Sequence, residues 1–193
     1  STPVRLQLLK HAVEVDGRYV LKSGATVWLL PKDGSSPDIT KDKSLINPSY
    51  PGVIERIIDI AAHDNASNGH ILAVDVKGDL WSAGSNDYGQ LGRDTSDQNS
   101  GGTVEGGVSG SQSLVPVDQG NGGKQLGNVV NITAGDKFSA AVVKATQTKQ
   151  DVDGLGNPKF EADGITPVMA KDYDHYDLYT WGRNASGQTG LGM

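Results

Sequence analysis

One segment of the chain occurs twice, and this internal repeat constrains the fold more than any other feature. Residues 79–92 (DLWSAGSNDYGQLG) and residues 177–190 (DLYTWGRNASGQTG) lie 98 positions apart and align without a gap. Seven of the 14 aligned positions are identical, including three glycines, one asparagine and one glutamine. The duplication predicts a repeat protein, in which each unit is one supersecondary element packed against its neighbour.

The similarity extends upstream of the two segments. Residues 57–64 (IIDIAAHD) align with residues 129–136 (VVNITAGD), and a second apolar stretch follows each block. Further upstream, Ser1–Val4 (STPV) is similar to Leu114–Val117 (LVPV). Short apolar stretches without a helical period are typical of strands when turn residues separate them. Each unit is therefore predicted to contain a Pro-Val strand, two apolar strands and a strand that leads into the repeated turn.

This order of elements resembles the repeat of the regulator-of-chromosome-condensation (RCC1) family. The resemblance covers residues 57–92 in the first unit, and residues 129–143 and 177–192 in the second. It implies an all-β fold with two β-propeller-type blades, each a four-stranded antiparallel sheet. Long loop and hairpin insertions interrupt the blades, which would form part of a larger propeller or assembly. The sequence departs from the family pattern at His63, where glycine is usual, and at Thr189, where leucine is usual.

The repeated turn supplies residues whose expected role is structural. Asn and Gly tolerate the left-handed backbone of tight turns, and an Asn side chain bonds nearby amide groups. A tryptophan at a strand end is a large apolar group that seals one blade against the next. Equivalent glycines in the two copies are predicted to share one backbone conformation. The predicted structural motif comprises Trp81, Gly84, Asn86, Gly89, Gln90, Gly92, Trp181, Gly182, Asn184, Gly187, Gln188 and Gly190.

The repeats divide the chain into two units. Residues 1–112 are predicted to form the first blade unit, and residues 113–193 the second. The first unit carries an insertion at about residues 7–51. Within it, residues 17–22 and 25–30 are apolar stretches around Ser-Gly, which predict a β-hairpin or a degenerate half-blade.

Two further insertions are rich in polar residues. Residues 93–112 consist largely of Gly, Ser, Asp and Asn without an apolar period, which predicts a mobile surface loop. Residues at about 144–172 separate the two inner strands of the second unit. An extended arm or hairpin that protrudes from the blade is the expected structure there.

Composition excludes several classes of function. The formal net charge is −6, so the basic surface expected of a nucleic-acid-binding protein is missing. No stretch approaches the roughly 20 apolar residues of a membrane helix, and the absence of Cys excludes disulfides and thiolate chemistry. The Gly-rich residues 120–124 and 154–156 match neither the phosphate-binding loop nor the dinucleotide fingerprint. We therefore predict no catalytic residue, no cofactor and no enzymatic activity.

Acidic residues and histidines are weak candidates for a metal site. Residues 151–157 begin like a calcium loop, but the fifth and twelfth positions lack the oxygen ligands of an EF-hand. A solvated acidic turn is the competing interpretation. His63 and His70 flank Asp64, and His175 lies among acidic residues. For His70 the resemblance implies a structural hydrogen bond inside the blade. The candidate calcium ligands are Asp151, Asp153, Asp172 and Asp174.

The resemblance also guides the functional expectation. Known family members include a nucleotide-exchange factor acting on chromatin, a secreted β-lactamase inhibitor and large bacterial surface proteins. Irregular repeat spacing and long Gly-, Asp- and Thr-rich insertions favour the last group. We expect a non-enzymatic structural, assembly or adhesion module of an extracellular bacterial protein.

Its expected partners are copies of itself, in a filament or ring, or other parts of a longer chain. A surface protein or a glycan is a further expected partner, whereas nucleic acid and membrane insertion are not. One alternative is an inhibitor or protein-binding module that grips a partner with its insertion loops. The other is a calcium-dependent carbohydrate-binding module.

Overall fold

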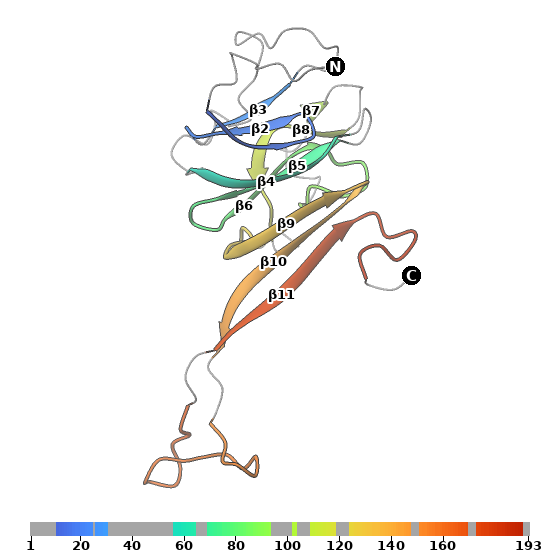
Figure 1. Ribbon diagram of the computed structural model, residues 1–193. Coiled ribbons are helices and arrows are strands. Elements are labelled where there is room, and N and C mark those ends of the chain that lie inside the picture. The colour runs from blue at the N-terminus through green and yellow to red at the C-terminus, as the bar shows by residue number, and fades with distance from the viewer. Residues whose placement is uncertain are drawn as a thin grey trace.

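The computed structural model contains three antiparallel β-sheets and, in the part of the chain that it describes, no helix. The sheets are stacked one above another, with the largest in the middle (Figure 1). The prediction of an all-β fold is therefore confirmed. The described residues are 11–24, 26–30, 56–64, 69–93, 102–103, 109–118, 124–147, 151–169 and 173–190.

The first sheet, called here the hairpin sheet, contains the predicted β-hairpin. Strands β2 (Tyr19–Lys22) and β3 (Val27–Leu29) pair antiparallel, in the register that places Val20 opposite Trp28. A third strand, β1 (Ala12–Asp16), adds to the free edge of β2. The insertion thus forms a small sheet that covers one face of the next one.

The middle sheet, called here the first blade, has the strand order β4-β5-β6-β8-β7. It contains the three strands predicted around residues 57–85, and β8 pairs with β6 so that Trp81 lies opposite Pro116. Pro116 ends its strand, where the missing N–H costs no ladder bond. The bounds are β4 (Ile57–His63), β5 (His70–Asp75), β6 (Leu80–Ser85), β7 (Gly102–Thr103) and β8 (Ser109–Pro116).

Two sequence-based expectations differ from this arrangement. The Pro-Val segment at residues 114–117 was expected to open the second unit, but it supplies the fourth strand of the first blade. Residues 93–112 were expected to form a loop, yet β7 and the first part of β8 lie within them. The physical reason is that β6 presents an open row of N–H and C=O groups, which the returning chain satisfies. Residues 94–101 and 104–108 lie outside the described part.

The third sheet, called here the second blade, has the order β11-β10-β9. Its strands are β9 (Val129–Gly135), β10 (Phe138–Gln147) and β11 (Tyr173–Gly182). The register repeats that of the first blade: Ile132 lies opposite Ala141, as Ile60 lies opposite Ala73. Among the described residues this sheet has three strands, where the sequence predicted four.

Apolar cores lie on both faces of the first blade. The core against the hairpin sheet includes Tyr19, Leu21, Val27, Ile71 and Trp81. The core against the second blade includes Leu72, Leu80, Val129, Ile132 and Ala141. Because β5 is covered on both sides, all six of its residues are buried, and this explains its nearly continuous apolar sequence.

An arm extends from the second blade. Strands β10 and β11 run together to the pair Gln147–Tyr173, and residues 151–169, called here the arm tip, lie beyond their ends (Figure 1). Isolated bridges join Val152 to Pro158 and Phe160 to Pro167 within the arm tip. The predicted protruding hairpin is therefore present, although β10 continues three residues past the predicted start of the insertion at about 144.

Candidate functional site

The repeated turn of the first blade is held by hydrogen bonds to its own Asn and Gln side chains. The N–H of Leu91 donates to the Asn86 side-chain oxygen at 2.9 Å, and the N–H of Tyr88 donates to the Gln90 side-chain oxygen at 2.9 Å. The Ser82 hydroxyl donates to the carbonyl of Leu91 at 2.8 Å. These bonds replace backbone ladder bonds, so the Asn and Gln side chains act as part of the main-chain hydrogen-bonding network.

The second copy reproduces this arrangement bond for bond. Thr189 N–H donates to the Asn184 side chain at 3.0 Å, Ser186 N–H donates to the Gln188 side chain at 2.7 Å, and the Thr180 hydroxyl donates to the Thr189 carbonyl. The equivalent glycines also match in backbone torsion. Their φ values are 106° and 101° at Gly84 and Gly182, 77° and 72° at Gly89 and Gly187, and 64° and 74° at Gly92 and Gly190. The predicted match of backbone conformation is confirmed.

The repeated turn of the first blade also forms the joint between the two blades. The carbonyl of Gln90 accepts the Ser139 hydroxyl at 2.9 Å and the Trp181 indole N–H at 2.8 Å. Since the single hydroxyl hydrogen of Ser139 is used there, the buried His70 Nε2 donates to Ser139 Oγ, at 2.8 Å. His70 therefore has the structural role that the resemblance implied, although the bond runs between blades.

Close packing makes Gly92 part of the same joint. A Cβ at Gly92 would lie 2.7 Å from Trp181 Nε1 and 2.9 Å from Val117 Cγ1. At the equivalent Gly190, no described atom lies within 4 Å. The two glycines share a backbone conformation, but only Gly92 is also required by a neighbouring side chain.

A buried carboxylate that the sequence analysis missed supports the first blade. Asp75 is fully buried, and its carboxyl oxygens accept the Trp81 indole N–H at 3.1 Å and the amide N–H groups of Lys77 and Asp79. The Lys77 and Asp79 amides belong to the turn between β5 and β6. The carboxylate thereby fixes this turn and the orientation of Trp81 together. Its register counterpart in the second blade is Val143, so comparison of the repeats could not reveal it.

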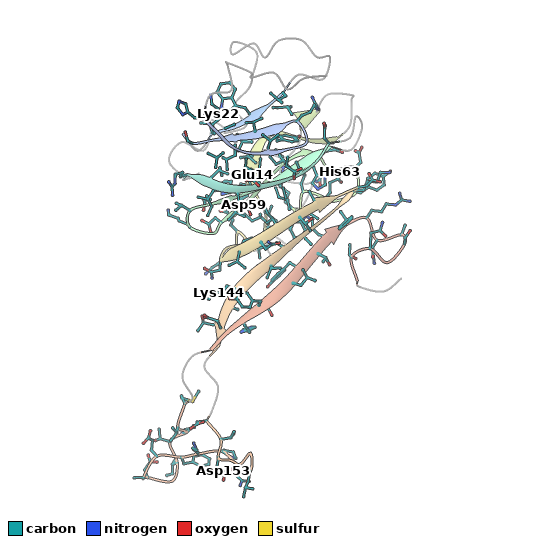
Figure 2. All side chains as sticks on the ribbon, viewed as in Figure 1. Glu14, Lys22, Asp59, His63, Lys144 and Asp153 are labelled. Carbon is teal, nitrogen blue, oxygen red and sulfur yellow. The ribbon has the colours of Figure 1, made fainter. Side chains whose placement is uncertain are left out.

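Carboxylates from the hairpin sheet cap the outer edge of the first blade. Glu14 accepts the N–H of Ile60 at 3.2 Å, and Asp16 accepts the N–H of Ala62 at 2.7 Å. Burial of the Glu14 carboxyl, with Asp59 nearby, raises the pKa of Glu14 above its ordinary value. Glu14 and Asp59 lie side by side in Figure 2. The two carboxylates therefore close an edge that would otherwise be open to another strand.

The candidate calcium ligands are placed in separate local contacts. Asp151 pairs with Lys159 Nζ at 2.8 Å, and Asp174 pairs with Lys144 Nζ at 2.8 Å. Asp153 accepts the N–H groups of Leu155 and Asn157, and Asp172 lies outside the described residues. In the described part of the chain, no group of three or more His, Asp or Glu side chains is placed to hold a metal ion.

His63 and His175, the other two histidines considered as metal ligands, each lie near a carboxylate. His63 Nε2 lies 3.7 Å from Asp136 Oδ1, and His175 Nε2 lies 3.5 Å from Asp177 Oδ2. Neither pair includes a nucleophile or a second acid among the described contacts. No helix that is long and apolar enough to cross a membrane is found in the described part of the chain.

The arm tip presents apolar side chains on an acidic surface. Asp153 and Asp163 each form a turn in which the carboxylate accepts the N–H two residues on, from Leu155 and Ile165. These two apolar side chains are 88% and 80% exposed. Hydrogen bonds to Asn157 and to Thr166 lower the pKa of Asp153 and of Asp163, respectively. Figure 2 shows Asp153 far from the three sheets.

Acidification is expected to weaken the Glu14 contact on the first blade before it loosens the arm tip. The pKa values of Asp153 and Asp163 lie below the ordinary 3.8. Their turns are therefore stabilised above pH about 4 and lose this stabilisation as the pH falls through the lowered pKa values. Amide NMR shifts of Leu155 and Ile165 should move only below that pH. Because the Glu14 pKa is raised, the Ile60 amide should respond at higher pH; the reverse order would contradict the assignment.

The two blades differ in how their far faces are covered. Leu80 of the first blade is fully buried against the second blade, whereas its repeat counterpart Leu178 is 70% exposed. Trp181 packs toward the first blade, so strand alternation places Tyr176 and Leu178 on the opposite face. Tyr176 is 62% exposed, and Val142 lies opposite Leu178 on the same face. This surface of Val142, Tyr176 and Leu178 is called here the open blade face.

Comparison with known proteins identifies the repeat. The family model described as "Regulator of chromosome condensation (RCC1) repeat" matches residues 77–142, which run from the β5–β6 turn into β10. The chain is therefore an all-β protein in which residues 77–142 are similar to the RCC1 repeat. No curated protein matches it significantly.

Several solved structures are similar to this chain. One is human WBSCR16, with 15% identity and a TM-score of 0.42, covering 91% of this chain and 47% of that one. A second is yeast RCC1 (Prp20) bound to Kap60, with 23% identity and a TM-score of 0.33, covering 79% of this chain and 37% of that one. A third is Prp20p from Saccharomyces cerevisiae, with 22% identity and a TM-score of 0.32, covering 81% of this chain and 40% of that one. The chain spans less than half the length of each.

Proposed function

We propose that this chain is a non-catalytic protein-binding module that associates with a further copy of itself through the open blade face. The observation that carries the proposal is the contrast between Leu80, fully buried, and Leu178, 70% exposed, at equivalent positions of two repeats. The same position is an interior position in one blade and a surface position in the other. A blade-type surface on the open blade face would give Leu178 the environment that Leu80 has.

Apolar area supports this proposal. Full burial of a Leu side chain contributes about 1.5–3 kcal/mol, and the neighbouring Tyr176 adds an aromatic side chain of the kind enriched at interfaces. Association of identical copies through such a face is head-to-tail, because the hairpin sheet occupies the equivalent face at the other end of the stack. Head-to-tail contacts give a ring when the rotation closes and a filament when it does not.

The proposed setting is an extracellular or cell-surface structure of a bacterium, in which the module serves assembly or adhesion. The irregular repeat spacing, the long polar insertions and the acidic, Cys-free composition support it. The formal net charge of the chain, −6, also disfavours a partner such as nucleic acid.

A second candidate function is capture of a different protein by the arm tip. Five exposed apolar side chains within 19 residues favour it; they are Val152, Leu155, Phe160, Ile165 and Met169. The four carboxylates and single lysine of residues 151–169 give this segment an acidic surround. Its partner would therefore be a protein with an apolar groove and a basic rim.

Sedimentation velocity of three chains tests the proposed self-association and the surface that mediates it. The wild-type chain is expected to associate in a concentration-dependent way at micromolar concentration. Leu178→Glu should weaken association about tenfold or more, since it buries a charge at the proposed contact. Leu155→Glu is the matched control, because it alters an even more exposed leucine on the arm tip and should leave association unchanged.

The outcome for the controls decides which surface acts. A loss of association in Leu155→Glu, with Leu178→Glu unaffected, would mean that self-association uses the arm tip and not the open blade face. Replacement of residues 148–172 by Asn-Gly removes the arm tip and checks independently whether association needs it. The replacement is feasible because Gln147 and Tyr173 are paired and a two-residue turn closes such a hairpin. A wild-type chain that remains monomeric at all concentrations would contradict self-association.

A further inference from the structure

The hairpin sheet has the same internal register as the two blades with which it is stacked (Figure 1). In the first strand of each sheet, one residue is left out of the pairing with the second strand: Val13 in β1, Ile58 in β4 and Val130 in β9. Counted from this bulge through the paired strands, Trp28 of the hairpin sheet is equivalent to Trp81 of the first blade. The three sheets therefore follow one pattern, and positions can be compared among all three.

The position two residues after the bulge is buried in both blades and exposed in the hairpin sheet. Ile60 is 3% exposed and belongs to the core against the hairpin sheet. Ile132 is 8% exposed and belongs to the core against the first blade. Their equivalent in the hairpin sheet, Val15, is 60% exposed. The same strand position thus packs against a neighbouring sheet twice and lies on the surface once.

The residues on which Ile60 packs have counterparts on the open blade face. Ile60 lies in one core with Leu21 and Val27 of the hairpin sheet. By register, the equivalents of Leu21 and Val27 in the second blade are Val142 and Leu178. The open blade face therefore has the surface on which such a position packs, and the hairpin sheet has such a position exposed.

We propose that the outer face of the hairpin sheet of one copy packs on the open blade face of another copy, with Val15 against Val142 and Leu178. This inference rests on the proposed self-association and names the surface that meets the open blade face. Val15 lies on that outer face because strand residues alternate, and its neighbours Glu14 and Asp16 point toward β4. The contact joins two different surfaces, so it is head-to-tail.

A polar contact supports the same register. The Glu14 carboxylate accepts the N–H of Ile60 at 3.2 Å. The counterpart of Glu14 in β9 is Asn131, an exposed residue whose side-chain oxygen is also an acceptor. In the proposed contact this oxygen faces the N–H of Val15, as Glu14 faces Ile60. Among the described contacts this bond occurs at one of the two existing joints, so it adds to the apolar contact and is not its basis.

The bulge residue provides a matched control on the same strand. Val13 is 66% exposed, similar to Val15. Its equivalents Ile58 and Val130 remain 48% and 51% exposed, although their sheets are stacked against a neighbour. A side chain at the bulge therefore stays outside the joint between sheets, and a charge there should not disturb the proposed contact.

Sedimentation velocity of the full chain tests the contact with three variants. Val15→Lys should weaken association about tenfold or more, because it buries a charge in the contact. Val15→Ile should strengthen association about fourfold, because it adds one buried methylene. It also introduces the residue found at both equivalent positions, Ile60 and Ile132. Val13→Lys should associate like the unmodified chain.

A mixture of two weakened chains tests whether two different surfaces meet. Val15→Lys retains an unmodified open blade face, and Leu178→Glu retains an unmodified hairpin sheet. An equimolar mixture should therefore form a complex through one unmodified contact, although each chain alone is weakened at least about tenfold. Such a complex also shows that both variants are folded.

Each outcome decides one of the two proposals. If Val15→Lys associates like the unmodified chain while Leu178→Glu does not, the inference is overturned and self-association stands. A mixture that remains monomeric also overturns it, as does equal weakening by Val13→Lys. An unmodified chain that is monomeric at all concentrations would instead overturn the proposed function.

Discussion

Replacing Trp81 by alanine is expected to lower the free energy of unfolding by about 3–5 kcal/mol. Trp81 is fully buried between the first blade and the hairpin sheet, so truncation leaves a cavity in addition to the lost apolar burial. The substitution also leaves the Asp75 carboxylate without one of its donors in a fully buried position. An unsatisfied buried polar group adds to the loss. This loss is a large fraction of the stability of an ordinary domain.

Tyr179 provides a matched control for this substitution. It occupies the equivalent repeat position in the second blade but remains 38% exposed. Tyr179→Ala is therefore expected to cost about 1 kcal/mol or less in the monomeric chain. Urea unfolding followed by circular dichroism measures both values. Equal losses of unfolding free energy in Trp81→Ala and Tyr179→Ala would mean that the two side chains are equally buried. That result would contradict their difference in exposure. Trp81→Phe separates the two contributions, because it retains most of the ring but removes the indole N–H.

The repeat made the turns predictable but not the partner of each strand. Gly89 and Gly187 share a backbone torsion that few other residues tolerate. A glycine at each of these positions therefore predicts the turn from the sequence alone. The Pro-Val strand, by contrast, carries no mark of the sheet to which it belongs. Its backbone N–H and C=O groups could pair with a strand of either blade. The strand pairs with β6 because the edge of β6 is open in the folded chain. The sequence therefore predicted the strand correctly but assigned it to the second unit, whereas it belongs to the first blade.

The hairpin insertion shows a different limit. Residues 17–30 predicted two strands, and both are present as β2 and β3. Strand β1 was not predicted, because its alternation is reversed: Val13 and Val15 are exposed, whereas Glu14 and Asp16 point toward β4. A carboxylate that caps a backbone edge resembles a solvated residue in the sequence. Its role becomes evident only when the neighbouring sheet is in place.

The joint between the blades was partly predictable. Trp181 was expected to seal one blade against the next, and it packs against the core between them. Its indole N–H, however, bonds to the carbonyl of Gln90, a backbone atom that no side-chain pattern identifies. Asp75 was missed for a related reason: a single Asp at a strand end matches an ordinary turn residue. Burial, which defines its role, is a property of the packed chain.

Replacing Gly92 by alanine is expected to lower the free energy of unfolding by about 2–5 kcal/mol. The left-handed backbone at φ 64° contributes about 1–2 kcal/mol of strain for a residue with a Cβ. The new Cβ would also lie 2.7 Å from the Trp181 indole nitrogen, which must move away from the carbonyl of Gln90. Overpacking of this kind contributes about 1–3 kcal/mol.

Gly190→Ala isolates the contribution of the joint, because the same turn conformation recurs there without a neighbour. Its φ of 74° imposes the same strain, yet in the described part of the chain nothing lies within 4 Å of the added Cβ. The expected loss at Gly190 is therefore only about 1–2 kcal/mol, and the difference between the two variants measures the packing of Trp181 against the first blade. Urea midpoints provide the comparison, and a shift of Trp181 fluorescence should accompany Gly92→Ala but not Gly190→Ala. If the two glycines cost the same, backbone torsion alone explains both, and the contact of Trp181 with the turn does not couple the blades. If Gly92→Ala lowers the free energy of unfolding more than Gly190→Ala does, the repeated turn has a second role in the first blade. It is then also the surface against which the second blade packs.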